Sequence, residues 1–170
     1  MSHAENFKAA FRNHPGGVAI LTADAGDGPV GLTATSVSSV SANPPMLMFS
    51  VSGHSSSGPA VKKATSVVVH LLGEQEVELA KTFATSGINR FEDEKSWARL
   101  ETGEPYLLAA TTWLRGKVVN QLDAGESTIV VIEILEVRLP AADGEAMMKP
   151  RPLVYHNRAW HTLSDSSTLD

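Results

Sequence analysis

The most constraining feature of this sequence is how closely its first apolar runs follow one another. Val18–Thr22, Val30–Ala34 and Met46–Val51 are short runs bounded by Gly, Pro, Asn or Asp, which is typical of β-strands. Neighbouring parallel strands need a crossover of about a dozen residues or more, usually a helix. The gaps here are too short for a helix after each strand, so the spacing predicts antiparallel pairing and argues against a parallel α/β sheet.

Later runs favour further strands. Val67–Leu72 is rich in Val, which suits a pleated surface. Ser127–Leu139 carries apolar residues on both alternating faces, as expected of a strand buried in a barrel on one face and in a dimer contact on the other. The remaining predicted strands are Leu107–Trp113, Lys117–Gln121 and Leu153–His156.

The predicted helices are few and short. Ser2-His3-Ala4-Glu5 has the pattern of a capping box ahead of a helix from Ala4 to Arg12. Glu74–Ala84 has a helical apolar stripe, and Glu94–Leu100 is expected to form another short helix. Many short strands with peripheral helices predict a mainly β barrel. With 170 residues and no internal repeat, we expect a single domain over 1–163 and a flexible tail over 164–170.

Composition excludes several classes of function. The net charge of −5 argues against nucleic acid or an anionic membrane as a partner, and the absence of cysteine excludes disulfides and thiolate chemistry. None of the six histidines pairs with another at a metal-binding spacing, so no metal site is expected. The polar N-terminus and the lack of a long apolar run predict a cytoplasmic location without a membrane span.

Two glycine- or serine-containing motifs favour ordinary structural roles. Gly26–Gly31 matches the letters G-x-G-x-x-G, but Pro29 and a strand follow it where a dinucleotide fingerprint would open a helix. A hairpin turn explains these glycines better. Gly53–Ser57 lacks the final glycine of a nucleophile elbow, which argues against a serine hydrolase.

Two hydroxyl-rich clusters are the main candidates for a binding site. Thr33–Ser41 begins at the end of a predicted strand, and considered alone it would be interpreted as a polar loop. Ser55–Ser57 precedes Pro59 and a short helix over 60–64, so it forms either a phosphate cradle, with Lys62 or Lys63 nearby, or a simple N-cap at Ser57. Arg90-Phe91 adds a cation beside an aromatic ring, which suits phosphate contact or ring stacking, or else a surface Arg beside a core Phe.

These segments occur in an order that resembles a known family. The pattern comprises Phe11-Arg12, Pro15–Val18, Gly31–Ser41, Pro44-Pro45, Phe49–Val51, Ser55–Ser57, Phe83-Ala84, Arg90-Phe91, Gly103–Leu107 and Pro152–His156. It is similar to the flavin reductase-like family, the small reductase components of two-component flavin monooxygenases. The resemblance spans about residues 7 to 160.

The resemblance implies a split β-barrel of the FMN-binding type and a homodimer. It also implies FMN or FAD as cofactor, NADH or NADPH as co-substrate, and a partner monooxygenase that receives reduced flavin. On the matching positions, the flavin-binding residues would be Thr33, Ala34, Thr35, Ser36 and Ser39 at the ring, Ser50 and Ser52 at the ribityl chain, and Ser56, Ser57, Lys62, Arg90 and Phe91 at or beside the phosphate. Tyr155 and His156 would lie on the nicotinamide side.

One segment departs from the family pattern. Family reductases commonly carry Gly-Asp-His before the long late strand, with the His near the nicotinamide, whereas this chain has Gly125-Glu126-Ser127. Serine can neither stack like an imidazole nor carry its charge. Ser127 therefore joins the nicotinamide-side candidates, and no catalytic residue is assigned. A flavin-binding electron carrier or storage protein without a nicotinamide site stays open, as does a haem-binding barrel.

Overall fold

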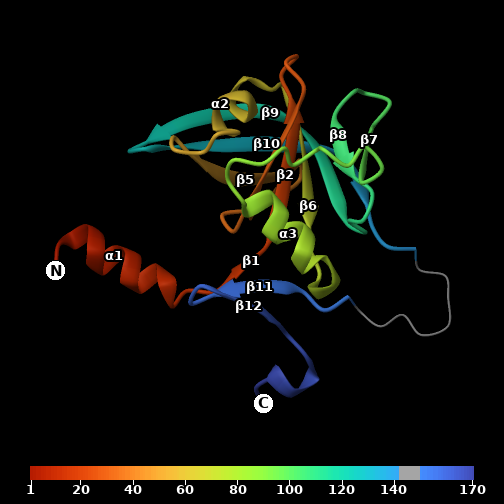
Figure 1. Cartoon of the computed structure of the whole chain (residues 1–170). Coiled ribbons are helices and arrows are strands. Elements are labelled where there is room, and N and C mark those ends of the chain that lie inside the picture. The colour runs from red at the N-terminus through yellow and green to blue at the C-terminus, as the bar shows by residue number, and fades with distance from the viewer. Residues whose placement is uncertain (142–149) are drawn as a thin grey trace.

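The computed structural model describes residues 1–141 and 150–170 (Figure 1). Its principal sheet has seven antiparallel strands in the order β3-β2-β6-β9-β10-β5-β4. Their bounds are β2 Ala19–Asp24, β3 Pro29–Ala34, β4 Ser38–Ala42, β5 Pro45–Ser52, β6 Ser66–Leu71, β9 Trp113–Ala124 and β10 Ser127–Arg138. Three neighbouring pairs, β2–β3, β4–β5 and β9–β10, are also consecutive in sequence, and the other neighbours are joined by longer connections.

The principal sheet curls around a core of small and branched apolar side chains. Leu21, Phe49, Val69, Val130 and Ile132 are among the residues buried there. The edge strands β3 and β4 are not paired with each other within the described residues, so the barrel is split on that side. The mainly β split barrel with peripheral helices that the sequence predicts is confirmed.

Two smaller sheets accompany the barrel. The first has the order β1-β11-β12, from β1 Gly16–Gly17, β11 Leu153–His156 and β12 Ala159–Thr162. The second pairs β7 Trp97–Arg99 with β8 Pro105–Leu107. The helix predicted over 94–100 is therefore wrong, and so is the strand predicted over 107–113, because β8 ends at Leu107 and β9 begins at Trp113.

Tertiary contacts explain why the β7–β8 hairpin forms instead of a helix. The Thr22 hydroxyl donates to the carbonyl of Pro105 at 2.5 Å, and buried His70 accepts from the backbone N–H of Leu107 at 3.0 Å. The indole of Trp97 packs edge-on against Phe91, with ring centroids 5.3 Å apart. These contacts with the barrel override a weak local helical periodicity.

The three α-helices lie outside the barrel. Helix α1 spans His3–Arg12 with the predicted capping box at Ser2, buries none of its residues, and extends away from the sheets in Figure 1. Helix α2 spans Gly58–Lys63. Helix α3, Val77–Ala84, follows the 3₁₀ turn η1 (Glu74–Glu76) and packs against β2 and β3 over a second core.

The remaining predictions about local structure fall on described residues. Gly26 and Gly28 have φ of 109° and 107° in the β2–β3 turn, which confirms a hairpin where a dinucleotide fingerprint was the alternative. The C-terminal segment contains a short 3₁₀ turn, η2 (Asp165–Ser167). Within 1–141 and 150–170, no helix has the length and apolar character needed to cross a membrane.

Candidate functional site

A cavity of about 610 Å³ opens between β3, β5 and the end of α3. We call it the hydroxyl cavity, because serine and threonine side chains dominate its lining. Of the sequence-predicted site residues, it brings together Thr33, Ala34, Thr35, Ser36, Ser50, Ser52, Ser56, Arg90 and Ser127. Two clusters that lie about 20 positions apart in sequence therefore face one space.

Several of these hydroxyls are held by backbone groups. The Ser36 hydroxyl donates to the carbonyl of Ser50 at 3.2 Å and accepts from the Ser50 N–H at 3.0 Å, which ties the segment after β3 to β5. The Thr33 hydroxyl donates to the carbonyl of Ala80 on α3 at 2.6 Å. These two residues shape the cavity wall, whereas the side chains of Thr35, Ser56 and Ser127 make no hydrogen bond to another described residue.

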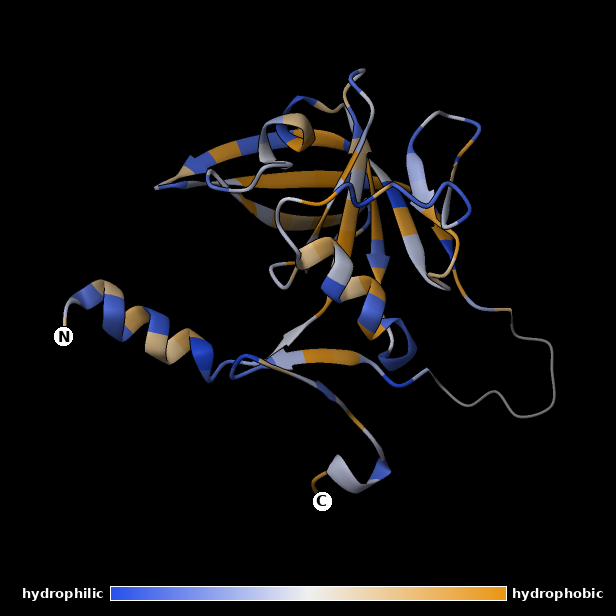
Figure 2. Cartoon of the chain, in the orientation of Figure 1, coloured by the Kyte–Doolittle hydropathy of each residue, from blue (hydrophilic) through white to orange (hydrophobic). Residues whose placement is uncertain are grey.

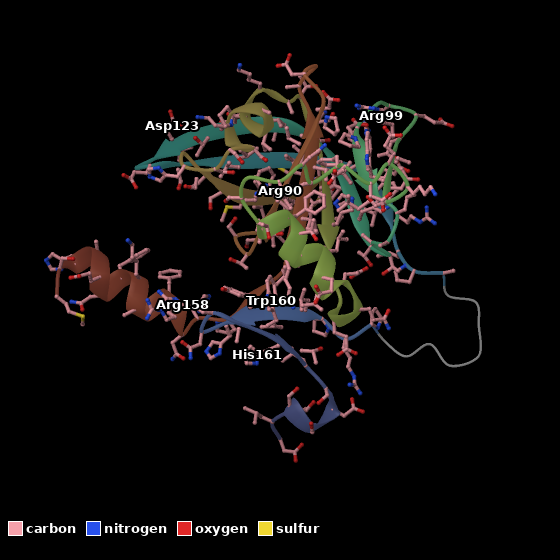
Figure 3. All side chains as sticks on the ribbon, viewed as in Figure 1. Arg90, Arg99, Asp123, Arg158, Trp160 and His161 are labelled. Carbon is pink, nitrogen blue, oxygen red and sulfur yellow. The ribbon has the colours of Figure 1, made fainter. Side chains whose placement is uncertain are left out.

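Arg90 is held at the edge of the hydroxyl cavity, beside α3 (Figure 3). Its Nη1 donates to the carbonyl of Gly31 at 2.6 Å and to the Ser57 hydroxyl at 3.3 Å, while Nε and Nη2 donate to the carbonyl of Thr85. Burial lowers the pKa of Arg90, yet arginine stays charged in proteins. The arrangement fixes one positive charge close to the cavity.

Four of the predicted flavin-binding residues lie outside the lining of the hydroxyl cavity. Ser57 and Phe91 line a smaller cavity of about 160 Å³ beside Arg90, and Lys62 lines another of about 290 Å³ next to Ser52. Ser39 is exposed on β4 and lines none of these cavities. Ser57 does not cap α2 through its side chain, because its hydroxyl donates to the carbonyl of Gly31 at 3.1 Å instead.

Sequence reasoning missed several residues of this lining, including His54, Phe83 and Ala84. The His54 Nε2 lies 3.4 Å from the carboxylate of Glu126, and both side chains are exposed. The imidazole of His54 therefore lines the same cavity as Ser127, although the two residues belong to different segments of the chain. The position of His54 directly before Ser55–Ser57 was a signal that could have identified it.

A second cavity, of about 840 Å³, lies between α1, the segment after β3 and the end of β11. Tyr155 and His156, predicted on the nicotinamide side, line this cavity and not the hydroxyl cavity. The two cavities have Thr35, Ser36 and Ser50 in common. We call the second one the basic cavity, after Lys8, Arg12 and Arg158 in its lining.

Metal chemistry has no visible basis in the described part of the chain. Among residues 1–141 and 150–170, no three side chains of His, Asp or Glu gather in the way a metal ion requires. The site is therefore described by hydroxyls, one fixed guanidinium and aromatic rings. This set is suited to holding an organic ligand through neutral donors and stacking.

Comparisons with known proteins agree on one family. The model of the Flavin reductase like domain matches residues 11–164. The chain is 44% identical to the NADH:FMN oxidoreductase of Rhodococcus qingshengii over 93% of this chain and 81% of that protein. It is 32% identical to the reductase component of a 4-nitrophenol 4-monooxygenase/4-nitrocatechol 2-monooxygenase from Rhodococcus opacus, over 95% and 90% of the two chains.

A comparison with a solved structure supports the same family. The crystal structure of a flavin reductase domain protein from Arthrobacter sp. FB24 superposes with a TM-score of 0.86 at 38% identity, and the match covers 98% of each chain. The family match extends over the barrel, the hydroxyl cavity and β11. The chain therefore belongs to the flavin reductase like domain family.

Proposed function

We propose that this protein is an NAD(P)H:flavin oxidoreductase that uses FMN or FAD. The observation that carries the proposal is the pair of adjoining cavities with Thr35, Ser36 and Ser50 in common. Direct hydride transfer requires two flat rings in contact. Adjoining cavities of this size allow one ring to lie in each. The name of the Rhodococcus qingshengii relative, NADH:FMN oxidoreductase, supports the same assignment.

The hydroxyl cavity is the proposed flavin site. A flavin ring presents carbonyl oxygens and ring nitrogens along one edge, and neutral hydroxyl and backbone donors match such an edge without charging it. Thr35, Ser52 and Ser56 offer hydroxyls there, and Arg90 supplies a fixed positive charge near the phosphate. When bound, the flavin supplies the hydride-accepting chemistry, so no acid–base dyad is required of the protein.

The nicotinamide is proposed to approach from the basic cavity. Tyr155 lies there, on β11 paired with Gly16, and its ring packs 4.8 Å from that of Trp160. The His156 Nε2 lies 3.0 Å from the amide oxygen of Asn13, which holds the imidazole in place. These residues position and cover the donor ring, while Ser127 and His54 border the flavin cavity.

The proposal includes two macromolecular partners. The outer face of β10 remains apolar after the barrel core is filled, which supports a homodimer. On the neighbouring strand β5, Ser50 pairs with Ile129 of this face and is one of the three residues that border both cavities. The reductase component from Rhodococcus opacus is named for a monooxygenase. We infer that this chain delivers reduced flavin to an oxygenase of that kind.

Steady-state oxidation of NADH and NADPH tests the proposal. We expect the purified protein to oxidise at least one of them with FMN or FAD well above the free-flavin background. Thr35→Val should weaken flavin binding by about tenfold, because a hydrogen bond to the flavin edge is lost. Ser41→Ala serves as the control, since Ser41 belongs to the same segment but lines none of the cavities described above.

The alternatives give different results in the same experiments. If flavin binds but neither NADH nor NADPH is oxidised above the free-flavin background, the reductase assignment is overturned in favour of an electron carrier or storage protein. A haem absorption band in the purified protein, with no flavin affinity, would overturn the flavin site itself. Equal flavin affinity of Thr35→Val and the wild type would remove Thr35 from the site.

A further inference from the structure

The end of the hydroxyl cavity at Arg90 and Ser56 has few donors left for a flavin phosphate. Nε and Nη2 of Arg90 both donate to the carbonyl of Thr85. Its Nη1 donates to the carbonyl of Gly31 and to the Ser57 hydroxyl. The Ser57 hydroxyl in turn donates to the carbonyl of Gly31 at 3.1 Å. Arg90 therefore supplies this end of the cavity with a positive charge more than with hydrogen bonds.

A phosphate monoester needs more positive charge than Arg90 alone provides. Such a phosphate carries about two negative charges at neutral pH. The hydroxyls of Ser55 and Ser56, which also line the cavity, can donate hydrogen bonds but are neutral. About one negative charge of the phosphate would therefore lack a counter-charge, which is unfavourable in a cavity.

His54 can provide the second positive charge. Among the described residues that line the hydroxyl cavity, Arg90 and His54 are the only ones whose side chains can be cationic, and none carries a carboxylate. His54 directly precedes Ser55 and Ser56, so its imidazole and their hydroxyls come from one turn. Ser52 fixes this turn, because its hydroxyl accepts from the His54 N–H at 3.2 Å and its carbonyl accepts from the Ser55 N–H at 3.1 Å.

Glu126 holds the imidazole of His54 only loosely. The Gly53 N–H donates to the carbonyl of Glu126 at 2.7 Å, which places the turn between β9 and β10 beside His54. The His54 Nε2 lies 3.4 Å from the Glu126 carboxylate, and the two side chains are 78% and 85% exposed. A pair this exposed contributes little to stability. The imidazole can therefore turn from Glu126 to a phosphate while the carboxylate returns to water.

The other charges next to His54 come from the β9–β10 hairpin and from α2. They are Glu126, Asp123, Lys62 and Lys63; Lys62 lies 3.9 Å from Asp123, and both lysines line the cavity of about 290 Å³. Histidine changes its charge between about pH 5 and pH 8, whereas carboxylates, lysine and arginine keep theirs in this range. A pH dependence of phosphate binding here therefore reports on His54 and on the phosphate itself.

From these observations we propose that protonated His54 contacts the flavin phosphate together with Arg90, and that this pair of cations makes the hydroxyl cavity selective for FMN. FMN ends in a phosphate monoester, whereas the same phosphate in FAD is a diester of smaller charge and riboflavin has none. Two cations stabilise the most highly charged phosphate best. The selectivity falls as the imidazole loses its proton. This inference rests on the proposed flavin site and names the flavin that the site prefers.

Binding of riboflavin, FMN and FAD, measured by quenching of flavin fluorescence without nicotinamide, tests the inference. At about pH 6 we expect His54→Gln to lose about tenfold in FMN affinity and less in FAD affinity, because a charged hydrogen bond to phosphate is removed. At about pH 8.5 the FMN affinities of the wild type and His54→Gln should agree, because histidine is neutral there. Riboflavin affinity should be the same in both proteins at each pH.

Two further variants separate charge from structure. His54→Lys keeps a positive charge at both pH values, so it should retain the selectivity for FMN at the higher pH as well. His3→Gln is the matched control, because His3 is exposed and lines none of the cavities described above. Unchanged FMN selectivity of His54→Gln at the lower pH would overturn the inference, as would equal losses of FMN and riboflavin affinity.

Failure of the proposed function gives different results. If the wild type binds none of the three flavins, the proposed flavin site and this inference are overturned together. If the wild type selects FMN through His54 but oxidises neither NADH nor NADPH, the reductase function is overturned and the inference stands.

Discussion

At the scale of single residues, buried polar groups attach the β7–β8 hairpin to the barrel. His70 on β6 is fully buried, with Nδ1 3.0 Å from the carbonyl of Ile20 and Nε2 accepting from the Leu107 N–H at 3.0 Å. Since Nε2 accepts, the neutral ring donates from Nδ1 to Ile20. Burial lowers the pKa of His70 to about 4, although the Ile20 contact acts in the opposite direction. Protonation would remove the acceptor for Leu107.

The pH dependence of stability should report on His70. The unfolded chain binds this proton near pH 6.5 and the folded chain only near pH 4. Between these values the unfolded state holds more protons, so the free energy of unfolding falls on acidification, by roughly 3 kcal/mol in total. Urea unfolding of His70→Gln should lack this slope, and exposed His161→Gln should keep it. A His70→Gln profile as steep as that of the wild type would contradict the assignment.

Glu104 forms a second polar attachment of the same hairpin. Its carboxylate accepts from the Ser66 hydroxyl at 2.6 Å, from Arg115 Nε at 2.8 Å and from the Thr102 hydroxyl. Burial acts to raise the pKa of Glu104, but these hydrogen bonds more than offset it and the pKa lies below the usual value of glutamate. Ionised Glu104 therefore stabilises the folded state.

Glu104→Gln should lower the free energy of unfolding by about 1–3 kcal/mol at pH 7, because Arg115 loses its buried counter-charge. The stabilisation by the carboxylate is complete above about pH 4.5 and is lost as the pH falls through the lower folded pKa. The difference in the free energy of unfolding between the variant and the wild type should therefore become smaller at acidic pH. Exposed Glu101→Gln is the control, and equal urea midpoints for all three proteins would show that the pair contributes nothing.

At the scale of elements, the contact between β3 and α3 determines one wall of the hydroxyl cavity. A Cβ on Gly31 would lie 2.7 Å from Phe83 Cε1 and 3.0 Å from the carbonyl of Leu21. Only glycine allows β3 to approach the helix this closely. Phe83 and Ala84 then line the cavity directly.

Gly31→Ala should force α3 away from β3. We expect a loss of about 1–3 kcal/mol in the free energy of unfolding from overpacking, together with weaker flavin binding. Urea unfolding and a flavin fluorescence titration measure the two effects. Gly17→Ala is a stability control, since a Cβ there meets nothing within 4 Å. Similar stability of the two variants would show that the close approach is not required.

At the scale of the whole molecule, one outer sheet face is left apolar. On β10, Val130 and Ile132 point into the core, and Ile129 and Val131, which alternate with them, point outward. The registers place Leu122 beside Ile129 and Met48 beside Val131 on this outer face. Figure 2 shows the hydrophobic stretches along these strands. A face of this kind is suited to an interface between two copies.

Val131→Lys should dissociate the proposed homodimer, because it introduces a charge at the centre of the outer face. Light scattering should give the mass of a dimer for the wild type and of a monomer for the variant. Leu108→Lys, at an exposed apolar position of the turn after β8, should remain dimeric. A monomeric wild type would contradict the homodimer.

Predictions from the sequence were most reliable where local spacing carries the information. The spacing of Val18–Thr22 and Val30–Ala34 is a property of consecutive residues, and the two runs pair antiparallel as β2 and β3. Met46–Val51 instead pairs with β10 and with β4, a strand in the segment that was expected to be a polar loop. The capping box at Ser2 is equally local. The hydroxyl clusters likewise pointed to the segments that line the hydroxyl cavity.

The sequence by itself determined the strand-rich architecture and the segments of the site, but only the tertiary structure decided the role of each side chain. Ser57 and Ser56 are neighbours of the same type, yet Ser57 donates to Gly31 while Ser56 faces the hydroxyl cavity. Lys8 and Arg158 meet at one cavity although 150 positions separate them. Local periodicity encodes which face of an element is apolar, whereas the partner of a hydroxyl or a cation depends on contacts between distant elements.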